Sequence, residues 1–232
     1  MHAPRTAARP VGLVLCHPSP YEYMRQRWVH RRASELAADA GFQVLRFDFL
    51  GTGDSAGALD SASFGQWLED AALAIAELKE ATGVQKICLG GSLLAATIAA
   101  TAVERGLAVD HLLLVDPVFR GAEHLRWLRS LPHGSAGQSG ELLGHRLTPA
   151  FGAALEGLDL LARPPRCPGK VLIVDSNGAA RPLVDLLGKL GQRVCLREAP
   201  AARDPYPDDL DEALLSMALP QAISSLLAQE LP

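Results

Sequence analysis

One stretch of the 232-residue chain constrains its fold more than any other, residues 85–102, with the sequence QKICLGGSLLAATIAATA. A short apolar segment passes through two adjacent glycines directly into an alanine-rich segment with helical character. A strand that turns tightly into a helix is typical of open α/β sheets, which bind ligands at the carboxyl ends of their strands. The stretch therefore predicts a parallel sheet with a site at that edge.

Short apolar runs alternate with longer helical patterns along the rest of the chain. The expected strands are residues 11–16, 42–47, 111–115, 170–174 and 192–196, together with the strand that opens residues 85–102. The expected helices are residues 27–40, 64–81, 122–130, 180–190 and 208–229, together with the helix that closes residues 85–102. This alternation predicts an α/β fold of about six mostly parallel strands with helices on both faces. We expect residues 1–10, which are polar and alanine-rich, to form a loose tail.

Residues 118–169 interrupt the alternation, because they show no strand pattern. Insertions of this length in a compact sheet are usually functional, since structureless loops beyond roughly 15 residues are uncommon. We therefore expect a core formed by residues 11–117 and 170–232, with residues 118–169 inserted as a lid.

Composition excludes several classes of function. The formal charge of -4 and the pI near 6.0 provide no general attraction to nucleic acid. No apolar run approaches the roughly 18 residues needed to span a bilayer, so we expect a cytoplasmic protein. Four cysteines without CxxC spacing indicate buried thiols rather than disulfides or zinc ligands. Gly51-x-Gly53 does not match the dinucleotide-binding fingerprint, and we expect no cofactor and no metal site.

From Val11 onward the chain resembles an α/β hydrolase that lacks its first hairpin. The most specific resemblance is carried by residues 21–57, YEYMRQRWVHRRASELAADAGFQVLRFDFLGTGDSAG, and by residues 112–121, LLLVDPVFRG. Both segments are similar to hydrolase-like proteins associated with exosortase systems and with polyketide or nonribosomal peptide clusters. The resemblance implies an oxyanion loop at His17 and Pro18 and a nucleophile, an acid and a histidine in that chain order.

The nucleophile can be sought in two registers of the G-x-S-x-G elbow. With Ser92 at the tip, Leu94 occupies the place where the helix passes closest to the strand, and leucine fits poorly there. Moving the tip to Leu93 restores small residues on both sides, but leucine is no nucleophile. Both registers remain open on the sequence alone.

The acid and the histidine are irregular as well. Asp116 and Asp175 both end expected strands, and either could serve as the acid, although Asp before Pro commonly begins a turn. No histidine follows His145. His111 begins a strand and should lie at the wrong end of the sheet. Three histidines of the expected lid, His124, His133 and His145, could reach the site on closure.

Other polar residues are expected at the mouth of the site or on the lid. The oxyanion and mouth residues are His17, Pro18, Tyr21, Glu22, Leu93 and Asp175, with Asp48 and Asp54 nearby. The basic residues of the lid are Arg120, Arg126, Arg129, His133, His145 and Arg146. Glu22 and Asp48 are more simply read as structural pairs with Arg25 or Arg46. The basic lid would suit an acidic acyl carrier protein, although a solvated face is the plainer interpretation.

Three hypotheses follow. We favour a degenerate-triad protein that binds an acyl or polyketide-like small molecule, or rearranges it without a covalent intermediate. A serine ester or thioester hydrolase that uses Ser92 with an unconventional base, and Asp116 as its acid, is the first alternative. A non-catalytic protein that docks a partner through its lid is the second.

Overall fold

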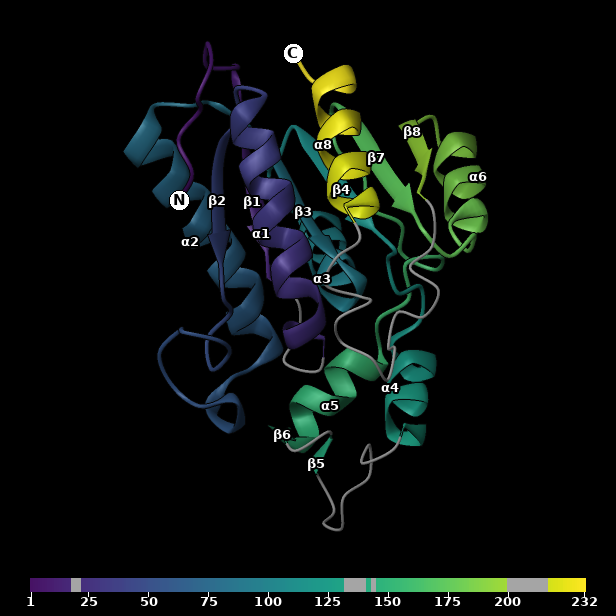
Figure 1. The fold of residues 1–232 in the computed structure, drawn as a ribbon. Coiled ribbons are helices and arrows are strands. Elements are labelled where there is room, and N and C mark those ends of the chain that lie inside the picture. Colours follow the sequence, from purple (N-terminus) through teal and green to yellow (C-terminus); the bar gives the residue numbers. More distant parts are fainter. Residues whose placement is uncertain (18–21, 132–140, 143–144, 200–216) are drawn as a thin grey trace.

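The computed structural model describes residues 1–17, 22–131, 141–142, 145–199 and 217–232. Six strands form one sheet in the order β2-β1-β3-β4-β7-β8, and every neighbouring pair is parallel (Figure 1). The strands are β1 (Val11–Cys16), β2 (Gln43–Phe47), β3 (Lys86–Ser92), β4 (His111–Val115), β7 (Lys170–Asp175) and β8 (Arg193–Glu198). The predicted α/β-hydrolase sheet of six parallel strands is confirmed.

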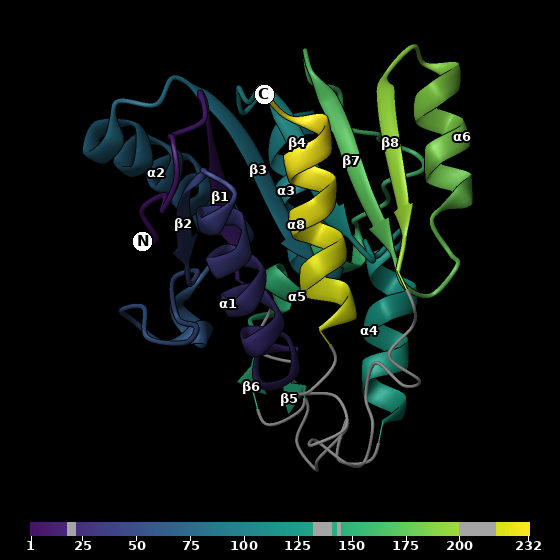
Figure 2. The same ribbon diagram turned by 45° about the horizontal axis from the view of Figure 1, so that its top comes forward.

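Helices cover both faces of the sheet. Helices α1 (Tyr23–Asp39) and α8 (Ala218–Glu230) lie side by side on one face, as Figure 2 shows. The other face carries α2 (Phe64–Thr82), α3 (Leu93–Glu104) and α6 (Arg181–Lys189). Strand residues alternate between the two cores, since Leu13 and Leu15 pack on the α1 side and Val14 and Cys16 on the other. No helix of the described residues is long and apolar enough to cross a membrane.

Residues 118–169 contribute further elements beyond the carboxyl ends of the strands (Figures 1 and 2). These elements are α4 (Gly121–Ser130), β5 (Glu141–Leu142), β6 (His145–Arg146) and α5 (Pro149–Glu156). The expectation of no strand here was wrong, because β5 and β6 form a short antiparallel pair. Two-residue strands are too short to produce a sequence pattern. That these residues act as a lid separate from the core stays a prediction.

The first ten residues are not a loose tail, contrary to expectation. His2 bridges Val44 of β2 in the antiparallel sense. Arg9 donates hydrogen bonds to the carbonyls of Ala40 and Leu231 and lies over the ring of Phe42. The segment is held by backbone and arginine contacts, which an apolar pattern cannot reveal.

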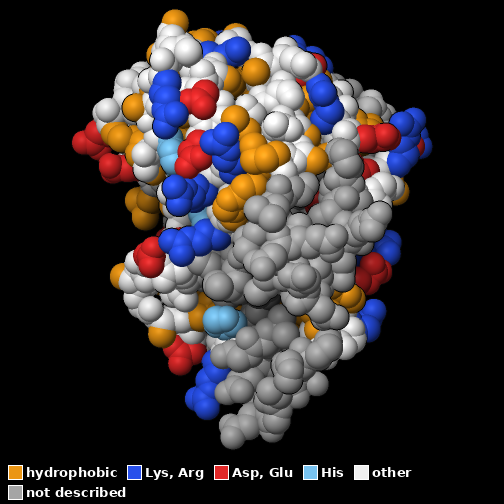
Figure 3. All heavy atoms as spheres, in the orientation of Figure 1, with side chains coloured by type: hydrophobic (Ala, Val, Ile, Leu, Met, Phe, Trp, Pro, Cys, Tyr) orange, Lys and Arg blue, Asp and Glu red, His pale blue; other side chains and the backbone are white. Residues whose placement is uncertain are grey.

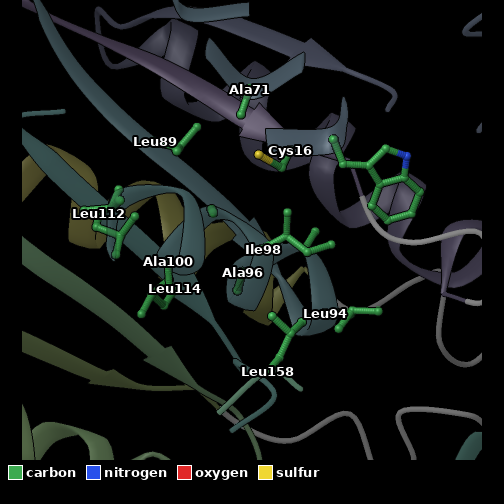
Figure 4. Packing of buried hydrophobic residues seen from close by; sticks show 14 of the residues in the cluster. Cys16, Ala71, Leu89, Leu94, Ala96, Ile98, Ala100, Leu112, Leu114 and Leu158 are labelled. Carbon is green, nitrogen blue, oxygen red and sulfur yellow. The ribbon is translucent and has the colours of Figure 1, made fainter. Parts of the chain in front are cut away.

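Helix α3 lies very close to the end of β3. A Cβ placed on Gly91 would come within 2.8 Å of the backbone carbon of Ala95 and 2.9 Å of the nitrogen of Ala96. Leu94, Ala96 and Ile98 of α3 are fully buried among strand side chains of the same core, as Figure 4 shows. This approach fixes how the chain turns from strand to helix.

We expect Gly91→Ala to destabilise the fold by about 1–3 kcal/mol, because the added methyl group overlaps the backbone of α3. Urea denaturation measures the change in the free energy of unfolding. The matched control is Gly188→Ala in α6, where a Cβ meets nothing within 4 Å. That control should be neutral or stabilising by up to about 1 kcal/mol, since alanine favours a helix. Equal effects of the two substitutions would contradict the close approach.

Candidate functional site

Leu93 occupies the tip of the strand-to-helix turn. Its φ of 51° lies in the left-handed region, whereas Ser92 has an extended backbone with φ -121° and ψ 152°. The small residues on either side of the tip are Gly91 and Ala95, whose close contact requires this register. Of the two registers that the sequence leaves open, the structure therefore adopts the one with leucine at the tip.

Ser92 points away from the tip, toward helix α1. Strand side chains alternate, so Ser92 faces the same side as Cys88, whose core includes α1. The serine is only 1% exposed, and its Oγ lies 2.7 Å from Nε2 of His30 in α1. Sequence reasoning missed His30. The available signal was its position beside Val29 and Ala33, on the face of α1 that is buried.

His30 is a buried ring in its neutral form. Burial, with smaller effects of His17 and Arg46, holds its pKa well below the ordinary value of 6.5. Among the described residues, the Ser92 hydroxyl makes its hydrogen bond with His30. In the neutral ring, Nε2 accepts from the hydroxyl in one tautomer and donates to it in the other.

His17 lies directly after β1 and is 4% exposed. Its Nε2 is 3.0 Å from Nη1 of Arg46, and its Nδ1 is 3.4 Å from Oδ1 of Asp48. Because arginine only donates, Nε2 accepts and the proton of His17 faces Asp48. Burial lowers the pKa of His17, an effect that Asp48 opposes. The ring centroids of His17 and His30 are 5.4 Å apart, so the two histidines form one cluster below α1.

Glu22, at the start of α1, lies 3.1 Å from Nε2 of His124 in α4. The Glu22 side chain is 0% exposed and that of His124 is 9% exposed. This buried contact links the start of α1 to residues 118–169. The sequence could not reveal it, because about a hundred residues separate the two partners.

The two candidate acids hold loops in place. Asp116, with φ 45°, accepts hydrogen bonds from the backbone N–H of Ser176 at 2.6 Å and from its hydroxyl at 2.7 Å. Burial raises the pKa of Asp116. Asp175 accepts from four backbone N–H groups of residues 177–180 and so closes the loop before α6. Neither carboxylate hydrogen-bonds a histidine within the part of the chain that the structure describes.

The expected lid residues are spread over several elements. Arg120 pairs with Glu123 and Asp159, and Arg129 pairs with Glu156. Arg126 is exposed on α4, and burial lowers the pKa of His145 on β6. Pro18, Tyr21 and His133 lie outside the described residues.

Charged residues of both signs are mixed on the surface. Figure 3 shows Lys and Arg interspersed with Asp and Glu over one face of the molecule.

His111 lies at the amino end of β4, as predicted, where its Nδ1 accepts from the backbone of Lys170. Within the described residues, no group of three His, Cys, Asp or Glu side chains could hold a metal ion.

A family model described as serine aminopeptidase, S33, matches residues 25–148. The chain belongs to this family. The match runs from α1 to β6 and includes the elbow, which confirms the resemblance to α/β hydrolases. The resemblance to exosortase or polyketide-cluster proteins stays a prediction.

Solved structures share the fold of this S33-family chain. The structure of Est1E from Butyrivibrio proteoclasticus with ferulic acid bound is 17% identical, with a TM-score of 0.65, covering 97% of this chain and 91% of that one. An esterase domain from Rhodothermus marinus is 16% identical, with a TM-score of 0.61 and coverages of 98% and 90%. An α/β serine hydrolase without a lid from Xanthomonas campestris is 20% identical, with a TM-score of 0.57 and coverages of 100% and 87%. Comparison with curated proteins finds no match.

The buried ring of His30 should make the stability of the fold depend on pH. Its pKa is lower in the folded chain than in the unfolded one, so its contribution is complete above pH 6.5 and is lost as the pH falls toward the folded pKa. We expect His30→Gln to reduce the slope of unfolding free energy against pH by up to about 1.4 kcal/mol per unit between pH 6 and 5. Urea denaturation at each pH measures it.

Ser92→Ala is the control for this experiment. It removes the hydrogen bond but keeps the ring buried, so stability should fall while the slope stays. An unchanged slope in His30→Gln would show that the ring is not buried in its neutral form.

Proposed function

We propose that this S33-family chain binds a small acyl or polyketide-like molecule at the carboxyl edge of its sheet, and holds or rearranges it without a covalent enzyme intermediate. The observation that carries the proposal is Leu93 at the elbow tip, with φ 51°. In an α/β hydrolase this position holds the nucleophile. A leucine there cannot form an acyl-enzyme, but its side chain offers an apolar surface to an acyl chain.

The buried histidines behind the elbow suit non-covalent chemistry. Burial lowers the pKa of both His17 and His30, which favours the neutral ring, the protonation state in which imidazole can accept a proton. A cyclisation or similar rearrangement needs a positioned ligand and proton transfer, but no serine. The ferulic acid in the structure of Est1E is a small carboxylic acid, which lends the ligand class indirect support.

The pairing of Ser92 with His30 favours a second candidate, a serine ester or thioester hydrolase. Their separation of 2.7 Å is the geometry of a nucleophile and its general base, and the family is described as serine aminopeptidases. Against this candidate, Ser92 is 1% exposed and faces α1. Helix α1 would have to move before a substrate could reach the hydroxyl.

An acyl carrier protein is a candidate partner, docking at α4. Arg126 is exposed there, but Arg120 and Arg129 already pair with carboxylates of residues 118–169. These pairs reduce the positive charge available to an acidic partner. The contacts therefore favour a free small molecule over a carrier-bound one, and over the purely non-catalytic docking role.

A serine-directed fluorophosphonate probe separates the two candidates. We expect no labelling of the purified chain, because the tip residue is leucine and Ser92 is buried. Intact-mass spectrometry gives the readout, with a competent serine hydrolase labelled in parallel. A mass increase that Ser92→Ala abolishes would overturn the non-covalent proposal and establish the hydrolase.

Binding of an acyl ligand should depend on Leu93 and not on Ser92. With octanoyl-N-acetylcysteamine in calorimetric titrations, we expect Leu93→Asn to weaken binding about tenfold, equivalent to about 1.4 kcal/mol of lost apolar contact. Asparagine tolerates a positive φ, so this variant should fold at least as well as the parent. Ser92→Ala should change the affinity less than about twofold. A large loss in Ser92→Ala alone would count against the proposal.

A further inference from the structure

Three polar residues form a stripe along one face of α1 and its N-cap, Glu22, Gln26 and His30, each four residues from the next; Glu22 and His30 are buried and Gln26 is half-buried. Residues four apart lie on one helix face, with Cβ atoms roughly 6 Å from each other. Glu22 is in contact with His124, and His30 shares a hydrogen bond with Ser92. The stripe begins where α1 meets residues 118–169 and ends behind the elbow.

Two atoms of this stripe are buried without a hydrogen-bond partner among the described residues, Oε1 of Gln26 and Nδ1 of His30. His30 as a whole is only 3% exposed. A buried polar atom that makes no hydrogen bond costs about 1–3 kcal/mol, and such atoms are rare in native proteins. Two of them on adjacent turns of one helix face indicate a site for a polar group.

The chemistry of the two atoms selects the group. His30 offers Nδ1, which donates or accepts according to the tautomer that meets Ser92, and Gln26 offers its amide oxygen. A hydroxyl suits both atoms, because it carries one proton and also accepts. A carboxylate has no proton for Gln26 and would lie near the Glu22 carboxylate, and an ammonium group cannot accept when Nδ1 carries the proton. A hydroxyl also remains suitable if the Gln26 amide is turned, since it donates and accepts equally well.

We propose that Gln26 and His30 form a subsite for a hydroxyl group of the ligand, so that the protein selects a hydroxyacyl molecule over the unsubstituted acyl molecule. The inference rests on the proposed function, which supplies the acyl ligand. It assigns the substrate class and a specificity residue, Gln26, on the inner side of α1, and it requires α1 to move for the ligand to reach His30, as a substrate would require for Ser92.

The test compares two ligands, octanoyl-N-acetylcysteamine and its β-hydroxyoctanoyl analogue, by calorimetric titration. We expect the wild-type chain to bind the hydroxylated ligand about tenfold more tightly, the effect of roughly one hydrogen bond to a buried group. Gln26→Met, which keeps the volume and removes the amide, should abolish this preference and leave octanoyl binding within about twofold. The matched control is Gln221→Met on α8, an exposed position, which should keep the preference.

The outcomes separate this inference from the proposed function. Equal affinities of wild type for the two ligands would overturn the inference and leave acyl binding intact, with a trapped water as the partner of the stripe. A preference that survives in Gln26→Met would overturn it too. If neither ligand binds, the proposed function itself fails, and the inference with it.

A stability measurement adds a readout that needs no ligand. Because Gln26 carries a buried amide oxygen without a partner in the described structure, Gln26→Met should not lower the free energy of unfolding. A loss of more than about 1 kcal/mol in urea denaturation would show that the amide serves the fold, and would overturn the inference.

Discussion

The close contact between Gly91 and the first turn of α3 is the constraint on which the site depends. With no room for a Cβ at position 91, the helix can approach the strand only if the turn is made at Leu93. Ser92 then remains in extended backbone, and strand alternation sends its side chain toward α1. If the turn were made one residue earlier, at Ser92, the hydroxyl would lie at the carboxyl edge of the sheet. With the turn at Leu93, the hydroxyl is buried behind that edge.

The space that receives Ser92 is polar, which is unusual between a sheet and its covering helix. His17, His30, Arg46 and Asp48 meet there, close to apolar residues such as Val29. Burial keeps both imidazoles neutral, so the cluster avoids the cost of an unpaired buried charge. Arg46 fixes the tautomer of His17, because arginine only donates. Two neutral imidazoles therefore lie behind an apolar elbow tip.

The alternation of apolar runs was enough to predict the sheet, because buried parallel strands are continuous apolar segments. His111–Val115 and Val11–Cys16 have the bounds that the pattern indicates. The site was predictable only in part. Two adjacent glycines permit two elbow registers, and the left-handed φ of Leu93 and the close approach at Gly91 distinguish them.

Other features of the site depend on contacts that no local pattern contains. His30 was not predicted, because the apolar spacing of α1 indicates which face is buried but not what a polar residue on that face contacts. Glu22 meets His124 through the tertiary fold, and Asp116 and Asp175 turned out to hold loops.

The backbone strain at Leu93 indicates what holds the elbow in its shape. A non-glycine residue at φ 51° costs about 1–2 kcal/mol, and in an enzyme that strain is normally attributed to presentation of the nucleophile. Here the tip has no nucleophile, yet the strain persists. The packing of Leu94, Ala96 and Ile98 in the core over-determines the turn, since relaxing it would withdraw three buried side chains from their contacts. The elbow is therefore maintained by the α3–β3 packing itself, and its shape does not depend on which side chain occupies the tip.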